Sequence, residues 1–159
     1  MSRAVLSLGS NIGDRRQHLS DAVAALETWV VKVSSIYRTP PWGPVPQDNY
    51  YNIALVTQSP DIDARGWLAL CGQLEKVAGR VRGLRWGPRT LDVDVIVVDD
   101  IVRVEPDLTL PHPRAHERAF VLLPWFEIEP AAVLPGRGAI ADLLAHLDTA
   151  ELTVVGNVG

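Results

Sequence analysis

The stretch LDVDVIVV, residues 91–98, decides the fold of this chain because it combines a strand pattern with two acidic residues. Its β-branched residues predict a strand. Strand alternation places the leucine and the first two valines on one face and Asp92 and Asp94 on the other. One face therefore joins a hydrophobic core, whereas the other carries two carboxylates that repel each other. Two interpretations follow: the acidic face is the solvated side of an antiparallel sheet, or it binds a divalent cation.

Further strand and helix patterns flank this stretch. Before it, they occupy residues 3–11 (strand), 14–26 (helix), 29–39 (strand), 50–58 (strand) and 61–79 (helix). The order strand, helix, strand, strand, helix, strand predicts an α+β fold with a ferredoxin-like βαββαβ core, an antiparallel sheet with helices on one face. After residues 91–98, we expect carboxyl-terminal additions: a strand or hairpin over 101–110 and helices over 117–124 and 140–146.

Each predicted helix before the acidic strand has an apolar face. The first follows a capping Asp14, and its apolar residues are Leu19, Ala22, Val23 and Leu26. The predicted apolar face of the second comprises Ile62, Leu68, Cys71, Leu74 and Val77. We interpret Cys71 as a buried small hydrophobe rather than a reactive thiol.

Composition narrows the class of protein. The 159 residues predict one domain, 1–159, and 47% apolar with 21% charged residues is typical of an ordinary folded protein. A net charge of -4 argues against a general affinity for nucleic acid or anionic membranes, so we expect neither as a partner. One cysteine excludes an internal disulfide, and no signal-peptide or membrane-spanning pattern is present. We expect a cytoplasmic monomer.

Two further clusters of polar residues flank the acidic strand. Upstream, GRVRGLRWGPR places Arg80, Arg82, Arg85 and Arg89 in a glycine-punctuated loop. Guanidinium groups bind phosphate oxygens, so this loop suits a polyphosphate, although a solvated basic loop or a small nucleic-acid surface would have the same composition. Downstream, two prolines flank His112, which suits a fixed hydrogen-bond donor to phosphate, and no pair of histidines has metal-ligand spacing.

Five motifs, in this order, resemble the 6-hydroxymethyl-7,8-dihydropterin pyrophosphokinase family of folate biosynthesis. They are LSLGSNIGDR, SSIYRTPPWGP, DNYYNIAL, GRVRGLRWGPRTLDVDVIVV and LPHPRAHERAFVLLPW. The resemblance covers about residues 4–129 and implies a ferredoxin-like core. It also implies transfer of the terminal pyrophosphate of ATP to the hydroxymethyl group of a reduced pterin, with release of AMP.

The resemblance also implies roles for individual residues. Asp92 and Asp94 would hold two Mg²⁺ ions that bridge the phosphates of ATP, the co-substrate. Arg80, Arg89, His112 and Arg118 would bind phosphates, and Arg85 and Arg82 are further candidates. Glu75 matches an acidic position beside the nucleotide. With the two aspartates, Arg80 and Arg89 form the implied catalytic set.

For the pterin, the resemblance implies that Tyr50 and Phe120 sandwich the bicycle while Asn52 reads its polar edge. Thr39, Pro40 and Trp42 would line the pocket through backbone groups, and Trp86 would close over it. Aromatic faces and an amide suit a flat polar heterocycle, and Tyr50 and Asn52 share a strand face. Periodicity alone also allows the rings to be core residues.

Two departures from the family pattern concern the ATP side. The loop after GRVR lacks the lysine and one residue that many relatives have, and Pro113 stands where tyrosine is frequent. Two other functions remain open: a non-catalytic ferredoxin-like module that binds nucleotide or RNA, and an enzyme that keeps the Mg-ATP site but uses another acceptor.

Overall fold

The structure, a computed structural model, describes residues 2–41, 44, 47–79 and 90–158. Its first half contains β1 (Ser2–Ser10), α1 (Arg15–Ala25), β2 (Val30–Val33), β3 (Ile36–Thr39), β4 (Tyr50–Ser59), α2 (Ala64–Val77) and β5 (Asp92–Val98). After these come β6 (Arg103–Glu105), β7 (Leu108–Leu110), a 3₁₀ turn (Ala115–Glu117), α3 (Ala119–Ile128), β8 (Val133–Leu134), β9 (Gly138–Ala139), α4 (Ile140–Leu144) and β10 (Thr153–Gly156).

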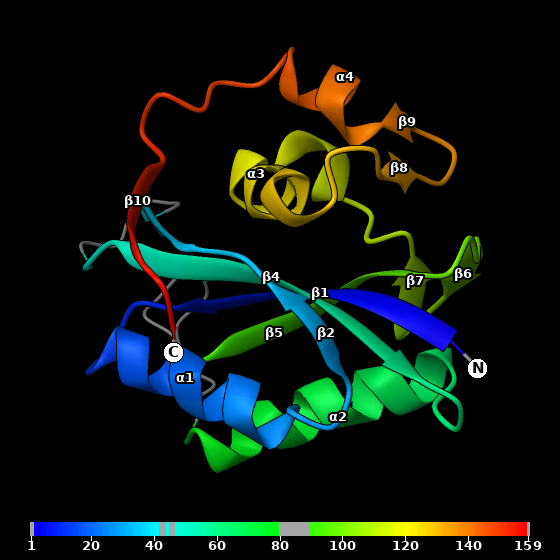
Figure 1. Cartoon of the computed structure of the whole chain (residues 1–159), viewed down its shortest axis with the longest axis horizontal. Coiled ribbons are helices and arrows are strands. Elements are labelled where there is room, and N and C mark those ends of the chain that lie inside the picture. The colour runs from blue at the N-terminus through cyan, green and yellow to red at the C-terminus, as the bar shows by residue number, and fades with distance from the viewer. Residues whose placement is uncertain (1, 42–43, 45–46, 80–89, 159) are drawn as a thin grey trace.

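The central sheet has the strand order β10-β3-β4-β1-β5, and β2 also pairs with β4. Every pairing in it is antiparallel. Helices α1 and α2 lie on one face, whereas α3 and α4 lie on the other (Figure 1). The predicted α+β class is confirmed, with the predicted element order, and the additional helices cover the second face.

The two sheet faces carry separate hydrophobic cores. Leu6 and Leu8 on β1 pack toward α1 and α2, where the buried partners include Trp67. Val5 on β1 packs toward α3, with Trp125 among the buried residues. This division follows from strand alternation, since neighbouring residues of β1 point to opposite sides. The register of buried β1 with β4 and β5 thus fixes which residues of these neighbours face each helical layer.

One predicted strand, over 29–39, is two strands in the structure. Ser34 lies between β2 and β3, and its hydroxyl accepts a hydrogen bond from the Ala54 amide of β4 at 2.9 Å. The Ser34 amide donates to the Ala54 carbonyl at 3.0 Å, so both backbone groups of Ala54 are satisfied. The side chain of Ser34 therefore replaces a backbone acceptor at the break between β2 and β3.

Two helical predictions were wrong in part. The helix predicted to end at Pro124 continues to Ile128, because Val121, Leu122 and Trp125 are buried against the sheet. That burial outweighs the hydrogen bond which proline removes from a helix interior. In α2 the predicted apolar residue Val77 is 88% exposed. Buried Trp67, which the prediction omitted, takes the central place on that face.

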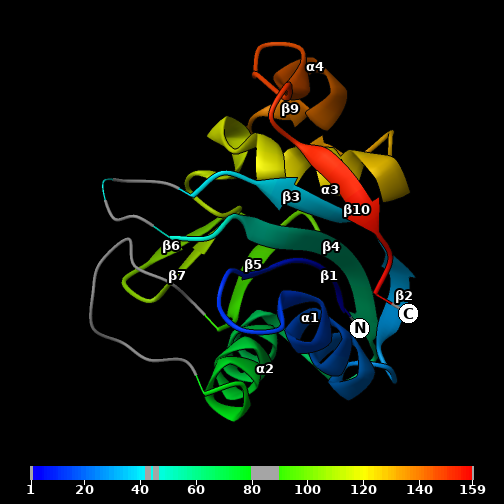
Figure 2. The same cartoon turned by 90° about the vertical axis from the view of Figure 1, so that its left-hand side faces the viewer.

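The chain after Pro130 contributes a strand that the sequence did not indicate. β10 pairs with β3 at the edge of the sheet (Figure 2). Arg16 of α1 holds this segment, because its guanidinium donates to the carbonyl of Asn157 at 2.7 Å and of Val155 at 3.0 Å. The amino- and carboxyl-terminal segments are thereby joined.

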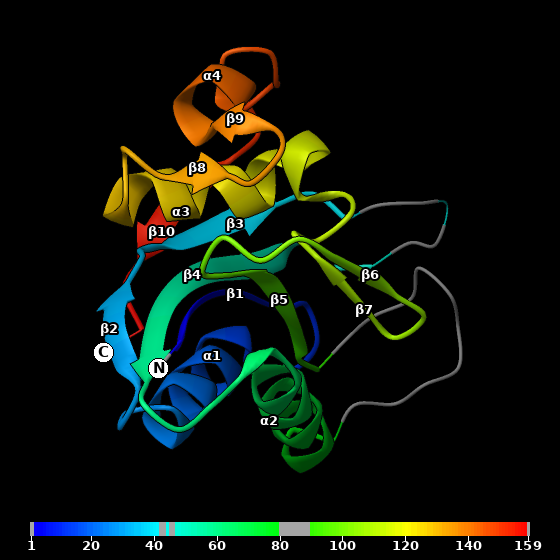
Figure 3. The ribbon, with the colours of Figure 1, turned by 90° about the vertical axis from the view of Figure 1, so that its right-hand side faces the viewer.

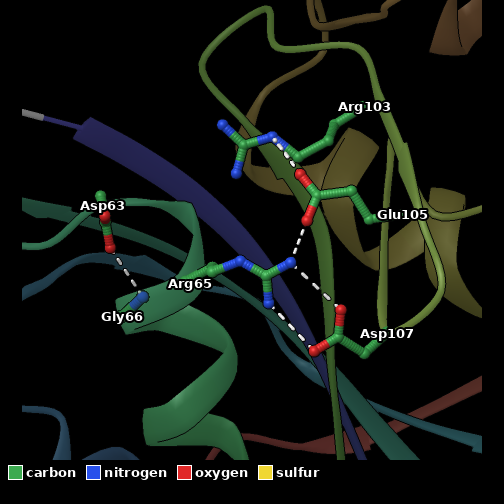
Figure 4. A network of polar contacts seen from close by, with 6 residues as sticks. All are labelled: Asp63, Arg65, Gly66, Arg103, Glu105 and Asp107. Atoms are coloured by element: carbon green, nitrogen blue, oxygen red, sulfur yellow. Dashed lines mark hydrogen bonds and ion pairs between the residues drawn. The ribbon is translucent and has the colours of Figure 1, made fainter.

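The β6–β7 hairpin, the predicted hairpin over 101–110, lies beside the amino-terminal end of α2 (Figure 3). Arg65 of that helix forms a two-bond contact with the Asp107 carboxylate, at 3.0 and 3.1 Å, and also pairs with Glu105 (Figure 4). Arg103 contacts the same Glu105 at 3.3 Å.

None of the helices in the described part of the chain is long and apolar enough to cross a membrane.

Replacing Trp67 by Ala should lower the free energy of unfolding by about 3 to 5 kcal/mol. The side chain is fully buried, donates to the Ser2 hydroxyl at 2.8 Å and packs edge-on to Trp29. Denaturant unfolding measures the loss. Val104→Ala is the control, because Val104 is 84% exposed and should change stability by less than about 0.5 kcal/mol. Equal effects of the two changes would contradict this core assignment.

Candidate functional site

The two aspartates of β5 lie at the end of the sheet where β1 finishes. Leu91, Val93 and Val95 are buried in the α1/α2 core, whereas Asp92 and Asp94 alternate with them and are partly exposed. Both carboxylates therefore belong to the α3 side of the sheet, as the alternation predicted. On the neighbouring strand β1, Asp92 is opposite Gly9 and Asp94 is opposite Ser7.

Gly9 lies between Asp92 on one side and Asn52 of β4 on the other. A Cβ built on Gly9 would be 2.6 Å from Asn52 Oδ1 and 3.4 Å from Tyr50 Cδ1. The first distance is too short for any side chain, so the amide of Asn52 extends over space that only glycine leaves open. Asn52, Tyr50 and the two aspartates consequently face one surface around Gly9.

Asn52 is held from its other side by β3. Its Nδ2 donates to Thr39 Oγ1 at 2.7 Å, and both residues are only 4% exposed. Thr39 pairs in register with Tyr50, and the exposed Pro40 follows directly. The hydrogen bond fixes the orientation of a buried amide, as a group that recognises a polar ligand edge requires.

Helix α3 borders this surface and carries Phe120 in its first turn. The ring is partly buried against the α3 core, and the Arg118 guanidinium carbon lies 5.6 Å from its centroid. Seven residues later, on the same helix face, the Glu127 carboxylate accepts from the Tyr37 hydroxyl at 2.7 Å and from the Ser35 amide at 3.0 Å. These bonds fix α3 on β3. Burial, followed by the hydrogen bond to Glu127, raises the pKa of Tyr37.

His112 contacts β5 two residues beyond Asp94. Its amide donates to the Ile96 carbonyl at 2.8 Å, and its Nδ1 accepts from the Arg114 amide at 3.2 Å. Burial, with smaller contributions from the charges of Arg118 and Arg114, lowers the pKa of His112 to about 4. At neutral pH the imidazole is therefore uncharged, with its proton on Nε2, because Nδ1 is an acceptor.

Glu75 connects α2 to the acidic strand. Its Oε2 accepts from the Val93 amide, between the two aspartates, at 3.1 Å. Cys71, one turn earlier, is buried as predicted, and burial together with the charges of Asp94 and Glu75 raises the pKa of its thiol. The carboxylate of Glu75 thus positions the strand, while Cys71 stays protonated.

The β1–α1 connection contributes contacts for which the sequence predicted no role. Asn11 is 2% exposed, and its Nδ2 donates to Gln47 Oε1 at 2.6 Å and to the Asp48 carbonyl at 3.1 Å. Arg15 Nη1 donates to the Asn49 carbonyl at 2.6 Å. The motif LSLGSNIGDR was the only signal of this connection, because the partners lie more than thirty residues away.

Several predicted site residues cannot be placed, since they lie outside the described residues: Trp42, Arg80, Arg82, Arg85, Trp86 and Arg89. Within the described ranges, no group of three or more histidine, cysteine, aspartate or glutamate side chains could hold a metal. The pair Asp92 and Asp94 still suits Mg²⁺, which is often held by one or two carboxylates and completed by water and phosphate oxygens.

Comparison with known proteins identifies the family of this chain. Residues 5–130 match the model of the family described as 7,8-dihydro-6-hydroxymethylpterin-pyrophosphokinase (HPPK). The chain belongs to this family. Glu75, Asp92, Asp94, His112 and Phe120 all fall in the matched region, as do Asn52 and Gly9.

Curated relatives and solved structures extend the match. The 2-amino-4-hydroxy-6-hydroxymethyldihydropteridine pyrophosphokinases of Mycobacterium tuberculosis and Mycobacterium leprae are 44% and 46% identical, each over 95% of this chain and 87% and 86% of theirs. A crystal structure of wild-type Plasmodium falciparum HPPK-DHPS has a TM-score of 0.71 at 14% identity, which shows the fold alone. It covers 91% of this chain, which spans only 40% of that longer chain.

The imidazole of His112 should remain neutral down to a pH near 4, and NMR of its ring nitrogens should show the Nε2–H form at neutral pH. Because its folded pKa lies below the unfolded value of 6.5, the unfolded state binds the proton first. Stability contributed by the neutral ring is present above about pH 6.5 and is lost as the pH falls toward 4. His112→Gln should show a shallower decline over that window. A ring that titrates near 6.5 in the folded protein would contradict the assignment.

Proposed function

We infer that this chain transfers pyrophosphate from ATP to the hydroxymethyl group of 6-hydroxymethyl-7,8-dihydropterin and releases AMP, a step of folate biosynthesis. The family match over residues 5–130 supports the reaction. One observation connects it to the residues of this chain: the two aspartates, Asn52 and Tyr50 surround Gly9 on a single face of the sheet. The proposed phosphate-binding residues on β5 and the proposed pterin-binding residues on β4 therefore lie on either side of strand β1.

Asp92 and Asp94 are the proposed ligands of two Mg²⁺ ions. Both are partly exposed carboxylates on one strand face, and hard cations prefer such oxygen ligands. When bound, the ions would neutralise phosphate charge and polarise the phosphoryl oxygens. Glu75 fixes the backbone between the aspartates through the Val93 amide, which keeps their spacing constant.

The phosphates of ATP would lie between β5 and the segment that begins at His112. The neutral imidazole would donate to a phosphate oxygen through Nε2, and Arg118 would supply a positive charge at the start of α3. Arg80, Arg89 and Arg85 complete the proposed phosphate-binding set. These donors would stabilise the charge that develops as the pyrophosphoryl group leaves.

The pterin would bind on the other side of β1, between β4 and α3. Asn52, whose amide is fixed by Thr39, would read the polar edge of the heterocycle, while Tyr50 and Phe120 supply aromatic faces. Pro40, Trp42 and Trp86 are proposed to line or close the same pocket. A flat polar ring held in this way would present its hydroxymethyl oxygen toward the aspartate side.

The reaction is an in-line displacement at the β-phosphorus. The hydroxymethyl oxygen forms a bond to this phosphorus while the bond to the bridging oxygen of the α-phosphate breaks, and AMP leaves. The hydroxyl proton is released to solvent. A loose transition state depends on positioning and charge neutralisation more than on a strong base, so no dedicated base is required.

The binding-module alternative is not favoured. The curated relatives are named as pyrophosphokinases, and helices cover both faces of the sheet that an RNA-binding module of this fold would expose (Figure 1). We propose a monomeric, single-domain enzyme of the cytoplasm with ATP and the reduced pterin as its partners and no nucleic acid.

Release of AMP from ATP and Mg²⁺ tests the proposal, with and without 6-hydroxymethyl-7,8-dihydropterin. The native protein should release AMP only with the pterin. Asp94→Ala should lower the rate by at least about a hundredfold, because a metal ligand is lost. Asp142→Ala, in the distant helix α4, should retain the native rate. Pterin-independent AMP, release of ADP instead, or an active Asp94→Ala variant would contradict it.

A further inference from the structure

The residues just before β4 are held by the first residue of α1 and by the turn before it. Asn49 immediately precedes Tyr50, and its carbonyl accepts from Arg15 Nη1 at 2.6 Å. Two residues earlier, Gln47 accepts from the buried amide of Asn11. The position at which the chain enters β4 is therefore set from α1 and the turn before it.

Arg15 also holds the residue on the other side of Tyr50. Its guanidinium carbon lies 4.0 Å from the centroid of the Tyr51 ring, a cation–π contact. Tyr51 packs on the α1/α2 side of the sheet, so strand alternation directs Tyr50 to the opposite side, where Asn52 also points. One side chain thus fixes the backbone before Tyr50 and the ring after it.

We propose that Arg15 is a positioning residue for the pterin and that it acts through its contacts with Asn49 and Tyr51. It fixes the rotation of β4 about its own axis at Tyr50 and Asn52, and so the angle at which these two side chains meet the heterocycle. This assignment rests on the proposed function. It predicts an effect on the pterin alone, because Asp92, Asp94, His112 and Arg118, the described residues proposed to bind metal and phosphate, belong to β5 and the segment from His112 onward.

Steady-state kinetics and calorimetry of Arg15→Ala test the assignment. The KM for 6-hydroxymethyl-7,8-dihydropterin should rise by about five- to tenfold, while the dissociation constant for Mg-ATP should stay within about twofold of native. Arg15→Lys keeps the charge and one donor but loses the planar group, so it should restore part of the difference. Matching shifts for both substrates would overturn the assignment.

Arg65→Ala is the matched control. It removes a guanidinium that pairs with Asp107 and Glu105 of the β6–β7 hairpin (Figure 4) and has none of the contacts of Arg15. Both KM values should remain native in this variant. A pterin KM that is equally unaffected in Arg15→Ala would overturn the positioning role.

Two substitutions of Tyr51 test the role without altering Arg15. Tyr51→Phe keeps the aromatic face and should retain the native pterin KM, whereas Tyr51→Leu should raise it as Arg15→Ala does. The reverse result, or no difference between them, would count against the contact.

The outcomes separate this assignment from the proposed function. Native protein that lacks pterin-dependent AMP release would overturn the proposed function and this assignment together. Active native enzyme with an unchanged Arg15→Ala variant would overturn the assignment only.

Discussion

The absence of a side chain at Gly9 is the constraint on which the rest of the site depends. β1 lies between β4 and β5 in the sheet, and its register puts Gly9 between Asn52 of β4 and Asp92 of β5. Any Cβ would meet Asn52 Oδ1 at 2.6 Å. The residues proposed to recognise the pterin ring and those proposed to bind phosphate are thereby brought to β4 and β5, on either side of the Gly9 backbone.

β4, β5 and α3, the elements around this surface, are each held by a polar contact to another element of the fold. Thr39 on β3 orients Asn52, Glu75 on α2 holds the strand between the aspartates, and Glu127 fixes α3 on β3. The apolar cores supply most of the folding energy, since they bury the greater area. The polar contacts set the geometry instead, and a site that positions two substrates depends on such geometry.

Local patterns predicted the features that depend on local chemistry. The alternation around Asp92 and Asp94 follows from strand geometry, and the element order indicated the α+β class. The break at Ser34 was not predictable, because it depends on a hydrogen bond to Ala54 on another strand. The continuation of α3 through Pro124 likewise depends on burial against the sheet.

In the site, too, the sequence indicated residues within motifs but not the contacts between segments far apart in the chain. Motif resemblance named Asn52 and the aspartates as candidate site residues, but neither the motifs nor periodicity indicated that Arg15 would contact Asn49 and Tyr51. That contact joins segments more than thirty residues apart, and only the folded sheet brings them together. The carboxyl-terminal strand β10 was missed because its short sequence pairs with a single edge strand.

The most direct test of this account is pterin binding by Gly9→Ala, measured by calorimetry beside Gly72→Ala. Gly72 lies within α2, and a Cβ at that position would meet nothing within 4 Å beyond the backbone of its own helix, so that variant should bind normally. Gly9→Ala should remain folded but lose at least about tenfold in pterin affinity, because Asn52 must move. Native affinity in Gly9→Ala would contradict the claim that the glycine makes room for the recognising amide.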